Sequence, residues 1–158
     1  ALQAAALARN AGAPDEEVLA ALCHDVGHLC APDDAPSMAG LGVVHHEDWG
    51  ADWLASLGFG RGVTDLVRGH VEAKRYLVAT RPEYAARLSA ASRGTLAHQG
   101  GPMSASEVAA YEANSRCAAK LRIRSWDEAA KVAGHQVPDA ESYRDMIGLH
   151  LARSADTP

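Results

Sequence analysis

A histidine followed directly by an aspartate, His24-Asp25, lies inside the segment LCHDVGHL, whose other residues are mostly apolar. An imidazole and a carboxylate destabilise such a segment when buried, unless they are paired or bind a metal ion. A single His-Asp dipeptide is weak evidence, because many arise by chance. The chain, however, carries eight histidines in 158 residues. Their order along the chain is therefore the feature to interpret.

Three further residues extend the pattern. His46 follows 22 residues later in HHEDWGADWL, His70 lies 24 residues after that in RGHVEAKRYL, and Asp127 lies in RSWDEAAK. Helices of a bundle can bring such residues together in its core. Imidazole and carboxylate ligands suit iron, manganese, cobalt or zinc, and Asp25 has two oxygens with which to bridge two ions about 3.5–4 Å apart. For any one histidine alone a structural role is the simpler interpretation, but the set predicts a dinuclear metal site.

The elements that must position these residues are expected to be helices. The chain is rich in alanine, aromatic residues make up only 5%, and few runs alternate between apolar and polar residues. Since alanine is the best helix former, we predict an all-α fold with little or no sheet. Ser104 and Glu107 have the spacing of a capping box, which marks a helix start.

The expected helices cover most of the chain. They are Ala1–Asn10, a buried helix from Pro14 through LCHDVGHL, one from near His45, Val63–Leu77, a short one from Pro82, Ser89–His98, one from Ser104 to about Leu121, one starting near Asp127, and Ala140–Arg153. Two loops separate them, Ala31–Ser37 and the break at Gln99–Pro102.

Length and charge exclude several classes of protein. A chain of 158 residues is enough for one domain. The net charge of −5 argues against nucleic acid as the main partner, and no apolar run is long enough to span a membrane. No secretory signal pattern begins the sequence. The cysteines Cys23, Cys30 and Cys117 have no zinc-ribbon spacing, so we expect free thiols and a cytoplasmic location.

The order H…HD…H…H…D is similar to that of the HD-domain family, whose members are all-α and usually hold one or two metal ions. The first histidine of that pattern is missing here. Because ALQAAALARN begins as a helix already under way, we expect residues 1–158 to form a single HD domain whose N-terminal segment, with that histidine, precedes Ala1.

Within this family the chain most resembles the mixed-valence di-iron oxygenases that cleave organophosphonates. The segments that carry this resemblance are GHVEAKRYL, LSAASRGTLAHQGGPMS and LRIRSWDEAAK, and GTL-x-x-QGGPM is the most specific of them. The resemblance implies a helical bundle around two iron ions, an Fe(II)/Fe(III) pair, with O2 as co-substrate. It assigns His24, Asp25 and Asp127 to one iron and Asp25, His46 and His70 to the other.

The resemblance also implies a set of residues that bind the substrate phosphonate: His28, Lys74, Ser92, Thr95 and Arg124. Spacing supports two of these. His28 follows His24 by four residues and Lys74 follows His70 by four, so each would project from the helix face of a metal ligand, one turn further on. A phosphonate dianion there would find charge-assisted hydrogen bonds.

The activity implied is oxidative cleavage of a C–P bond in organophosphonate catabolism. The expected partner is a small organophosphonate, 1-hydroxy-2-aminoethylphosphonate or its N-methylated or trimethylammonio analogue. The products would be phosphate and glycine or a glycine-betaine-type carboxylate. The main alternative is an HD-type metal-dependent phosphohydrolase of a nucleotide or phosphate ester; a non-catalytic HD scaffold and a helical bundle with chance histidines are further alternatives. The nitrogen substituent, the metal identity from ligands alone and the oligomeric state stay open.

Overall fold

The computed structural model describes residues 1–155, and all the regular elements within them are helices, apart from one isolated antiparallel bridge between Ser37 and Val43. The all-α prediction is therefore confirmed. The elements are α1 (Leu2–Asn10), α2 (Asp15–Cys23), α3 (Gly27–Cys30), α4 (His46–Ser56), α5 (Arg61–Thr80), α6 (Pro82–Arg87), α7 (Ala90–His98), α8 (Ala105–Glu112), α9 (Cys117–Ala129), the 3₁₀ turn η1 (Ala140–Tyr143) and α10 (Arg144–Ala155).

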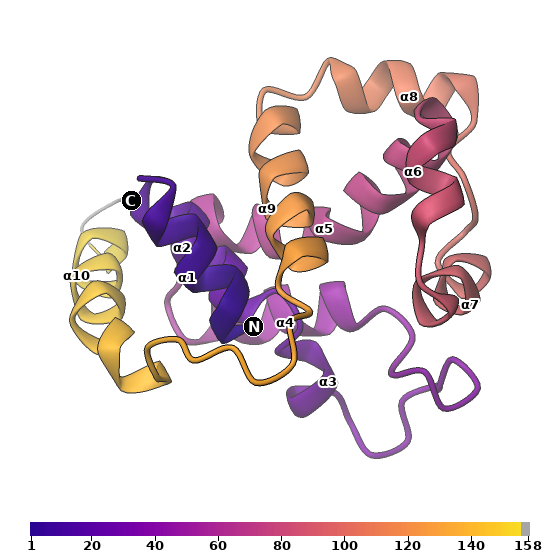
Figure 1. Cartoon of the computed structure of the whole chain (residues 1–158). Coiled ribbons are helices and arrows are strands. Elements are labelled where there is room, and N and C mark those ends of the chain that lie inside the picture. Colours follow the sequence, from indigo (N-terminus) through magenta and orange to yellow (C-terminus); the bar gives the residue numbers. More distant parts are fainter. Residues whose placement is uncertain (156–158) are drawn as a thin grey trace.

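The 20-residue helix α5 organises the molecule, because α2, α4 and α9 all pack against it. In Figure 1, α1 and α10 lie to the left of α5 and α9, and α6, α7 and α8 lie to their right. The core is built from α1, α2, α4, α5 and α9. Fully buried alanines on α1, namely Ala4, Ala5 and Ala8, let that helix approach α2 and α9 closely.

The predicted continuous helix through LCHDVGHL is wrong, because α2 ends at Cys23 and α3 begins at Gly27. Between them the chain tightens, with Val26 N–H donating to the Cys23 carbonyl and His28 N–H donating to the Asp25 carbonyl. These i to i+3 bonds are those of a 3₁₀ turn. The new direction brings α3 against α4, where a Cβ on Gly27 would lie 1.8 Å from the carbonyl oxygen of His46.

The predicted helix from Ser104 to about Leu121 is correct only in its first part. The Ser104–Glu107 capping box is present, but α8 ends at Glu112. The Asn114 side-chain oxygen accepts a hydrogen bond from Arg116 N–H, which closes a turn before α9 begins at Cys117. Asp127 consequently lies near the end of α9, whereas the sequence placed it near the start of a helix.

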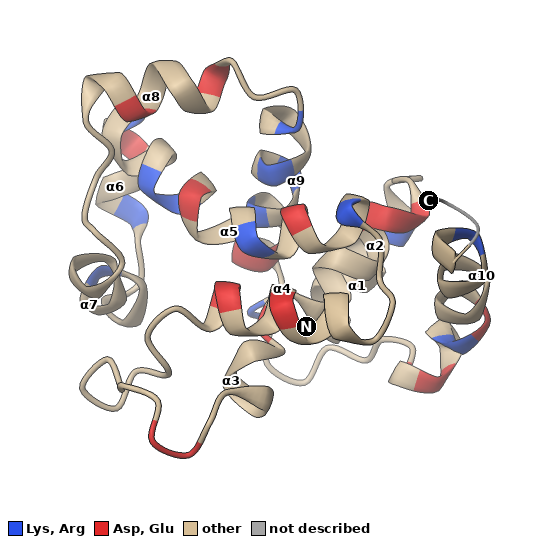
Figure 2. Ribbon diagram, turned by 180° about the vertical axis from the view of Figure 1, so that it is seen from behind, with Lys and Arg blue, Asp and Glu red and all other residues tan. Residues whose placement is uncertain are grey.

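Charged residues of both signs are interspersed along α5 (Figure 2), whereas on α9 the basic residues precede the acidic ones. Among the described residues, no helix is both long enough and apolar enough to cross a membrane.

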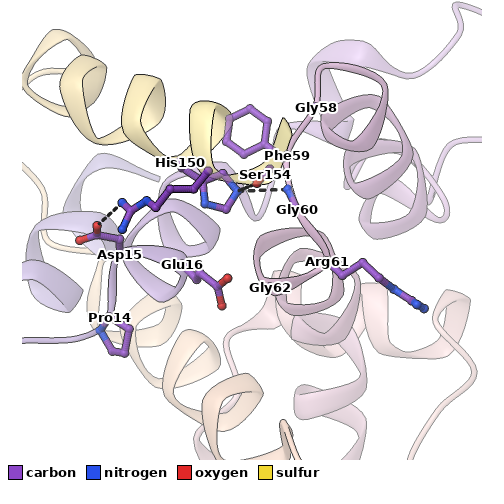
Figure 3. Close-up of a pocket in the computed structure, with 11 residues that line it drawn as sticks. Pro14, Asp15, Glu16, Gly58, Phe59, Gly60, Arg61, Gly62, His150 and Ser154 are labelled. Atoms are coloured by element: carbon purple, nitrogen blue, oxygen red, sulfur yellow. Dashed lines mark hydrogen bonds and ion pairs between the residues drawn. The ribbon is translucent and has the colours of Figure 1, made fainter. Parts of the chain in front are cut away.

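The last helix closes onto the start of α5 and α2. His150 of α10 is buried, and its Nε2 accepts a hydrogen bond from Gly60 N–H at 3.1 Å, immediately before α5 (Figure 3). Arg153 of the same helix pairs with Asp15 at the start of α2. A cavity of about 740 Å³ lies between these segments, lined by residues of the α2 and α5 starts and of α10. None of the predicted metal ligands lines it.

Candidate metal centre

One predicted ligand group forms where α2 ends and α9 passes. His24 Nε2 lies 3.1 Å from Asp25 Oδ2 and 3.5 Å from Asp127 Oδ1. The His24 side chain is almost completely buried, and the Asp127 side chain is 13% exposed. Their ligand atoms lie within 4.8 Å of one another, which is close enough for a single ion to contact all three.

The second oxygen of Asp25 faces the other predicted group. Asp25 Oδ1 lies 3.6 Å from His46 Nε2 and 3.8 Å from His70 Nε2. His46 stands at the start of α4 and His70 in the middle of α5, and both are buried. Asp25 therefore directs one oxygen toward each group, as a bridging carboxylate would. We call His24, Asp25, His46, His70 and Asp127 the His–Asp cluster.

The second nitrogen of each histidine fixes which nitrogen faces the cluster. His24 Nδ1–H donates to the Ala21 carbonyl at 2.9 Å, and His70 Nδ1–H donates to the Val67 carbonyl at 2.6 Å. The Nδ1 of His46 lies 3.3 Å from a carboxylate oxygen of the buried Glu47. With a proton on Nδ1, the rings of His24 and His70 turn Nε2 toward the cluster, where a metal ion would bind it. This is the arrangement that outer-shell carbonyls and carboxylates impose on metal-binding histidines.

These tautomers test whether a metal fits. The Nε2 atoms of His46 and His70 lie 3.1 Å apart. Two lone pairs at that distance repel each other unless a cation or a proton lies beside them. His24 Nε2 is also buried, and the polar groups that face it are the carboxylates of Asp25 and Asp127. Three imidazole nitrogens and two carboxylates that face one another match the donor set that transition metals bind.

The electrostatics of the cluster keep its carboxylates charged. Burial opposes ionisation, yet the hydrogen bond with His24 and the neighbouring imidazoles hold the pKa of Asp25 well below its usual range. The pKa of Asp127 is likewise lowered, by His24 and then Arg124, against the effect of burial. Burial lowers the pKa of His46 to about 4 and of His70 to about 3. Burial also opposes a charge on His24, but hydrogen bonds to Asp127 and Asp25 raise its pKa to about 9.

A small cavity of about 150 Å³ adjoins the cluster, and the predicted substrate-binding residues line it. Lys74 of α5 is buried and donates from Nζ to Thr95 Oγ1 of α7 at 2.9 Å. Ser92 lies one turn earlier on α7. Burial, and then the nearby Arg124, lower the pKa of Lys74 to about 8. The cavity thus carries a buried ammonium beside two hydroxyls, next to the metal ligands.

Arg124 lies at the same cavity, but its guanidinium already bonds to protein groups. Nη1 donates to Asp127 Oδ2 at 2.7 Å, Nε donates to the Tyr84 hydroxyl at 2.8 Å, and Nη2 contacts Glu128. In this arrangement Arg124 orients Asp127. A direct bond to a phosphonate would require one of these partners to be exchanged.

His28 lines the cavity from a different helix than the sequence predicted. It lies on α3, beyond the turn that ends α2, so the expected shared helix face with His24 does not exist. Its ring instead stacks on that of His46, with centroids 4.0 Å apart. It still lines the cavity.

The sequence analysis did not predict several residues that line this cavity. Lys131, with Nζ 3.7 Å from Asp127 Oδ1, follows Asp127 by four residues, and this helical spacing was a usable signal. Gln99 belongs to the QGG segment that carried the family resemblance. Met38 and Leu41 come from the irregular segment before α4, where no periodic pattern marks them.

The model of the HD domain matches residues 1–113 of this chain. The chain belongs to the HD-domain family. This match contains four of the five residues of the His–Asp cluster, and Asp127 lies beyond it.

Curated relatives align with this HD domain over nearly its whole length. A protein of Leisingera caerulea named [1-hydroxy-2-(trimethylamino)ethyl]phosphonate dioxygenase (glycine-betaine-forming) is 43% identical over 146 residues, which cover 92% of this chain and 74% of the relative. Hydroxymethylphosphonate dioxygenase of Gimesia maris is 40% identical over 155 residues, covering 98% and 77%. An uncharacterised protein of Acanthamoeba polyphaga mimivirus is 35% identical, covering 98% and 71%. The predicted resemblance to phosphonate-cleaving oxygenases is confirmed by the first two.

Proposed function

We propose that this chain is a di-iron oxygenase that uses O2 to cleave the C–P bond of a 1-hydroxyphosphonate, giving phosphate and a carboxylate. The observation that carries the proposal is the position of Asp25. Its two oxygens face two separate groups of metal-ligating side chains, and the Lys74–Thr95 pair stands at the same cavity. A two-metal site beside an anion-binding pocket matches the chemistry named for the two phosphonate dioxygenases among the relatives.

The residues divide into two sets of ligands. His24, Asp25 and Asp127 would hold one iron, and Asp25, His46 and His70 would hold the other. When bound, an Fe(II)/Fe(III) pair supplies the redox chemistry that O2 activation needs. The protein contributes fixed ligand orientation, because backbone carbonyls hold the imidazoles of His24 and His70, and a Glu47 oxygen lies 3.3 Å from His46 Nδ1.

The phosphonate would bind through groups on three elements. Lys74 on α5 is protonated at neutral pH, because its pKa is about 8, and it can form a charge-assisted hydrogen bond. Ser92 and Thr95 on α7 offer hydroxyl groups beside it, and His28 on α3 lies across the cavity. Holding the substrate beside the metal ligands in this way would lower the entropy cost of bringing the reacting groups together.

The names of both phosphonate dioxygenases specify a hydroxyl group on the carbon that carries phosphorus. We infer that this chain takes substrates with the same 1-hydroxyphosphonate group, and we favour 1-hydroxy-2-aminoethylphosphonate or its N-methylated or trimethylammonio analogue. The products would then be phosphate and glycine or a glycine-betaine-type carboxylate. The free thiols of Cys23, Cys30 and Cys117 are consistent with the cytoplasmic location that we propose.

The test is anaerobic loading with iron, partial oxidation, and EPR spectroscopy with and without 1-hydroxy-2-aminoethylphosphonate, on the complete natural protein. We expect a mixed-valence signal that shifts when the phosphonate is added, and phosphate release only after O2 is admitted. Hydrolysis of a phosphate ester without O2, together with no substrate-responsive signal, would instead identify an HD-type phosphohydrolase.

A further inference from the structure

The irregular segment between α3 and α4 folds back onto His28. Ser37 and Val43 form the isolated bridge, and Met38 N–H donates to the Gly42 carbonyl, so residues 37–43 make a small closed loop. We call this segment the 37–43 loop. Val43 N–H donates to His28 Nδ1 at 3.1 Å. The loop thus contacts the one histidine of the cavity that belongs to neither ligand group.

In this contact Nδ1 of His28 accepts a proton, whereas Nδ1 of His24 and of His70 donates one. In His24 and His70, Nδ1 donates its proton to a backbone carbonyl, so Nε2 is the nitrogen left to face a metal ion. In His28, Nδ1 accepts a proton from a backbone amide. A neutral imidazole carries one proton, so that proton must lie on Nε2. His28 therefore presents an Nε2–H donor, whereas His70 presents an Nε2 lone pair.

Without this contact, His28 could serve as a further metal ligand. A ring nitrogen of His28 lies within 4.8 Å of ligand atoms of Asp25 and His46, and the His28 ring stacks on that of His46. Binding a metal through Nε2 would shift the proton to Nδ1, where it would face Val43 N–H. Two donors would then point at each other.

We propose that the 37–43 loop is a positioning element that keeps His28 out of the metal ligand set and commits its Nε2–H to donate to the substrate anion. The inference rests on the proposed function for the identity of that anion, a phosphonate. Val43 supplies the amide that selects the tautomer. Gly42 supplies the space, because a Cβ at this position would lie 2.6 Å from His28 Cε1.

The tautomer can be measured directly on the metal-free chain. Long-range ¹H–¹⁵N NMR distinguishes a protonated from an unprotonated ring nitrogen, and a His28→Gln variant identifies the His28 signals by their loss. We expect Nε2 of His28 to be protonated and Nδ1 to be unprotonated, with the opposite pattern for His70. A proton on Nδ1 of His28 would overturn the proposal whatever the activity of the enzyme.

A pair of glycine variants tests the consequence for binding. Gly42 and Gly40 both have positive φ, +121° and +83°, so alanine is strained at either position, but a Cβ at Gly40 meets nothing within 4 Å. Gly42→Ala should displace the His28 ring, while Gly40→Ala should report the backbone strain alone. The loss of one hydrogen bond to a charged group predicts a KM for the phosphonate that is about 10- to 100-fold higher in Gly42→Ala. Its iron content should match that of Gly40→Ala.

Two results would refute this role. Equal KM values in the two variants would show that the ring position does not matter for binding. A loss of iron confined to Gly42→Ala would show that the position of His28 matters for holding the metal, against the proposal. Failure of the proposed function gives a different result, because the chain would then cleave no phosphonate. The NMR measurement of the His28 tautomer does not depend on that activity.

Discussion

Replacing Gly27 by alanine should separate two helices that the metal centre needs in contact. A Cβ at Gly27 would lie 1.8 Å from the carbonyl oxygen and 2.8 Å from the amide nitrogen of residues on α4, His46 and Gly50 respectively. Real Cβ atoms essentially never approach closer than 3.0 Å. The obstacle is backbone, so no side chain can rotate away. The segments must move apart by about 1.2 Å, because contact between non-bonded atoms turns strongly repulsive at shorter range.

The expected cost follows from two opposing effects. Overpacking of this kind costs about 3 kcal/mol at the upper end of the usual range. Removing a glycine from a helix returns about 0.5–1 kcal/mol by restricting the unfolded chain. The net loss is about 2 kcal/mol, which corresponds to a fall of about 4–8 °C in Tm for a chain of this size.

The same displacement should impair metal binding. His46 Nε2 and Asp25 Oδ1 lie 3.6 Å apart on the two sides of the Gly27 contact. Metal–ligand distances tolerate deviations of only about 0.2 Å, so a shift of about 1.2 Å leaves one shared ion without one of its ligands. Thermal unfolding and iron content per chain measure the two effects. A Gly27→Ala protein with unchanged Tm and unchanged iron content would refute this reading of the α3–α4 contact.

Three further outcomes are expected. Gly148→Ala, in the interior of α10 with nothing within 4 Å of the new Cβ, should raise the free energy of unfolding by about 0.5–1 kcal/mol, and chemical denaturation measures it; a loss of stability would contradict this, and the variant is the matched control for Gly27→Ala. Lys74 has a pKa of about 8 in the folded chain against 10.5 normally, so it loses its charge as pH rises through 8. Above that pH, KM for a phosphonate should rise by up to about tenfold per pH unit, and a KM independent of pH would argue against Lys74 as the anion's partner. The free energy of unfolding should rise between about pH 8 and 10.5, because the folded chain binds the proton less tightly than the unfolded chain. Glu47→Gln should weaken iron binding by about 10- to 100-fold, measured by competition with a chelator, because Glu47 faces His46 Nδ1 at 3.3 Å; an unchanged affinity would show that it does not orient His46.

The sequence predicted the parts of the fold that depend on local signals. The Ser104–Glu107 capping box and Pro82 at the first position of α6 both mark helix starts in the structure. The order of histidines and aspartates likewise predicted a set of residues that the fold brings together. These signals could be read because each depends on neighbouring residues or on a pattern that persists through the chain.

The features that the sequence did not predict depend on contacts between distant segments. The turn at residues 24–26 lies in an apolar run whose pattern predicts a single helix. The chain turns where Gly27 packs against the backbone of α4, a contact between separate segments that the local pattern does not indicate. The irregular 37–43 loop has no periodicity, so its contact with His28 was not foreseen. The break before α9 depends on one side-chain hydrogen bond, from Arg116 N–H to Asn114, and it moved Asp127 to the other end of its helix.

The His–Asp cluster also has a consequence for the time at which it forms during synthesis. His24 and Asp127 are neighbours in space although about 100 residues separate them in the chain, and contacts between such distant residues form late in folding. While the ribosome is still making α8, the nascent chain has His24, Asp25, His46 and His70 but lacks the carboxylate that completes the first ligand group. In the proposed enzyme, that ligand group would therefore be complete only after α9 has emerged. Iron loading would then be among the last steps in the maturation of the protein.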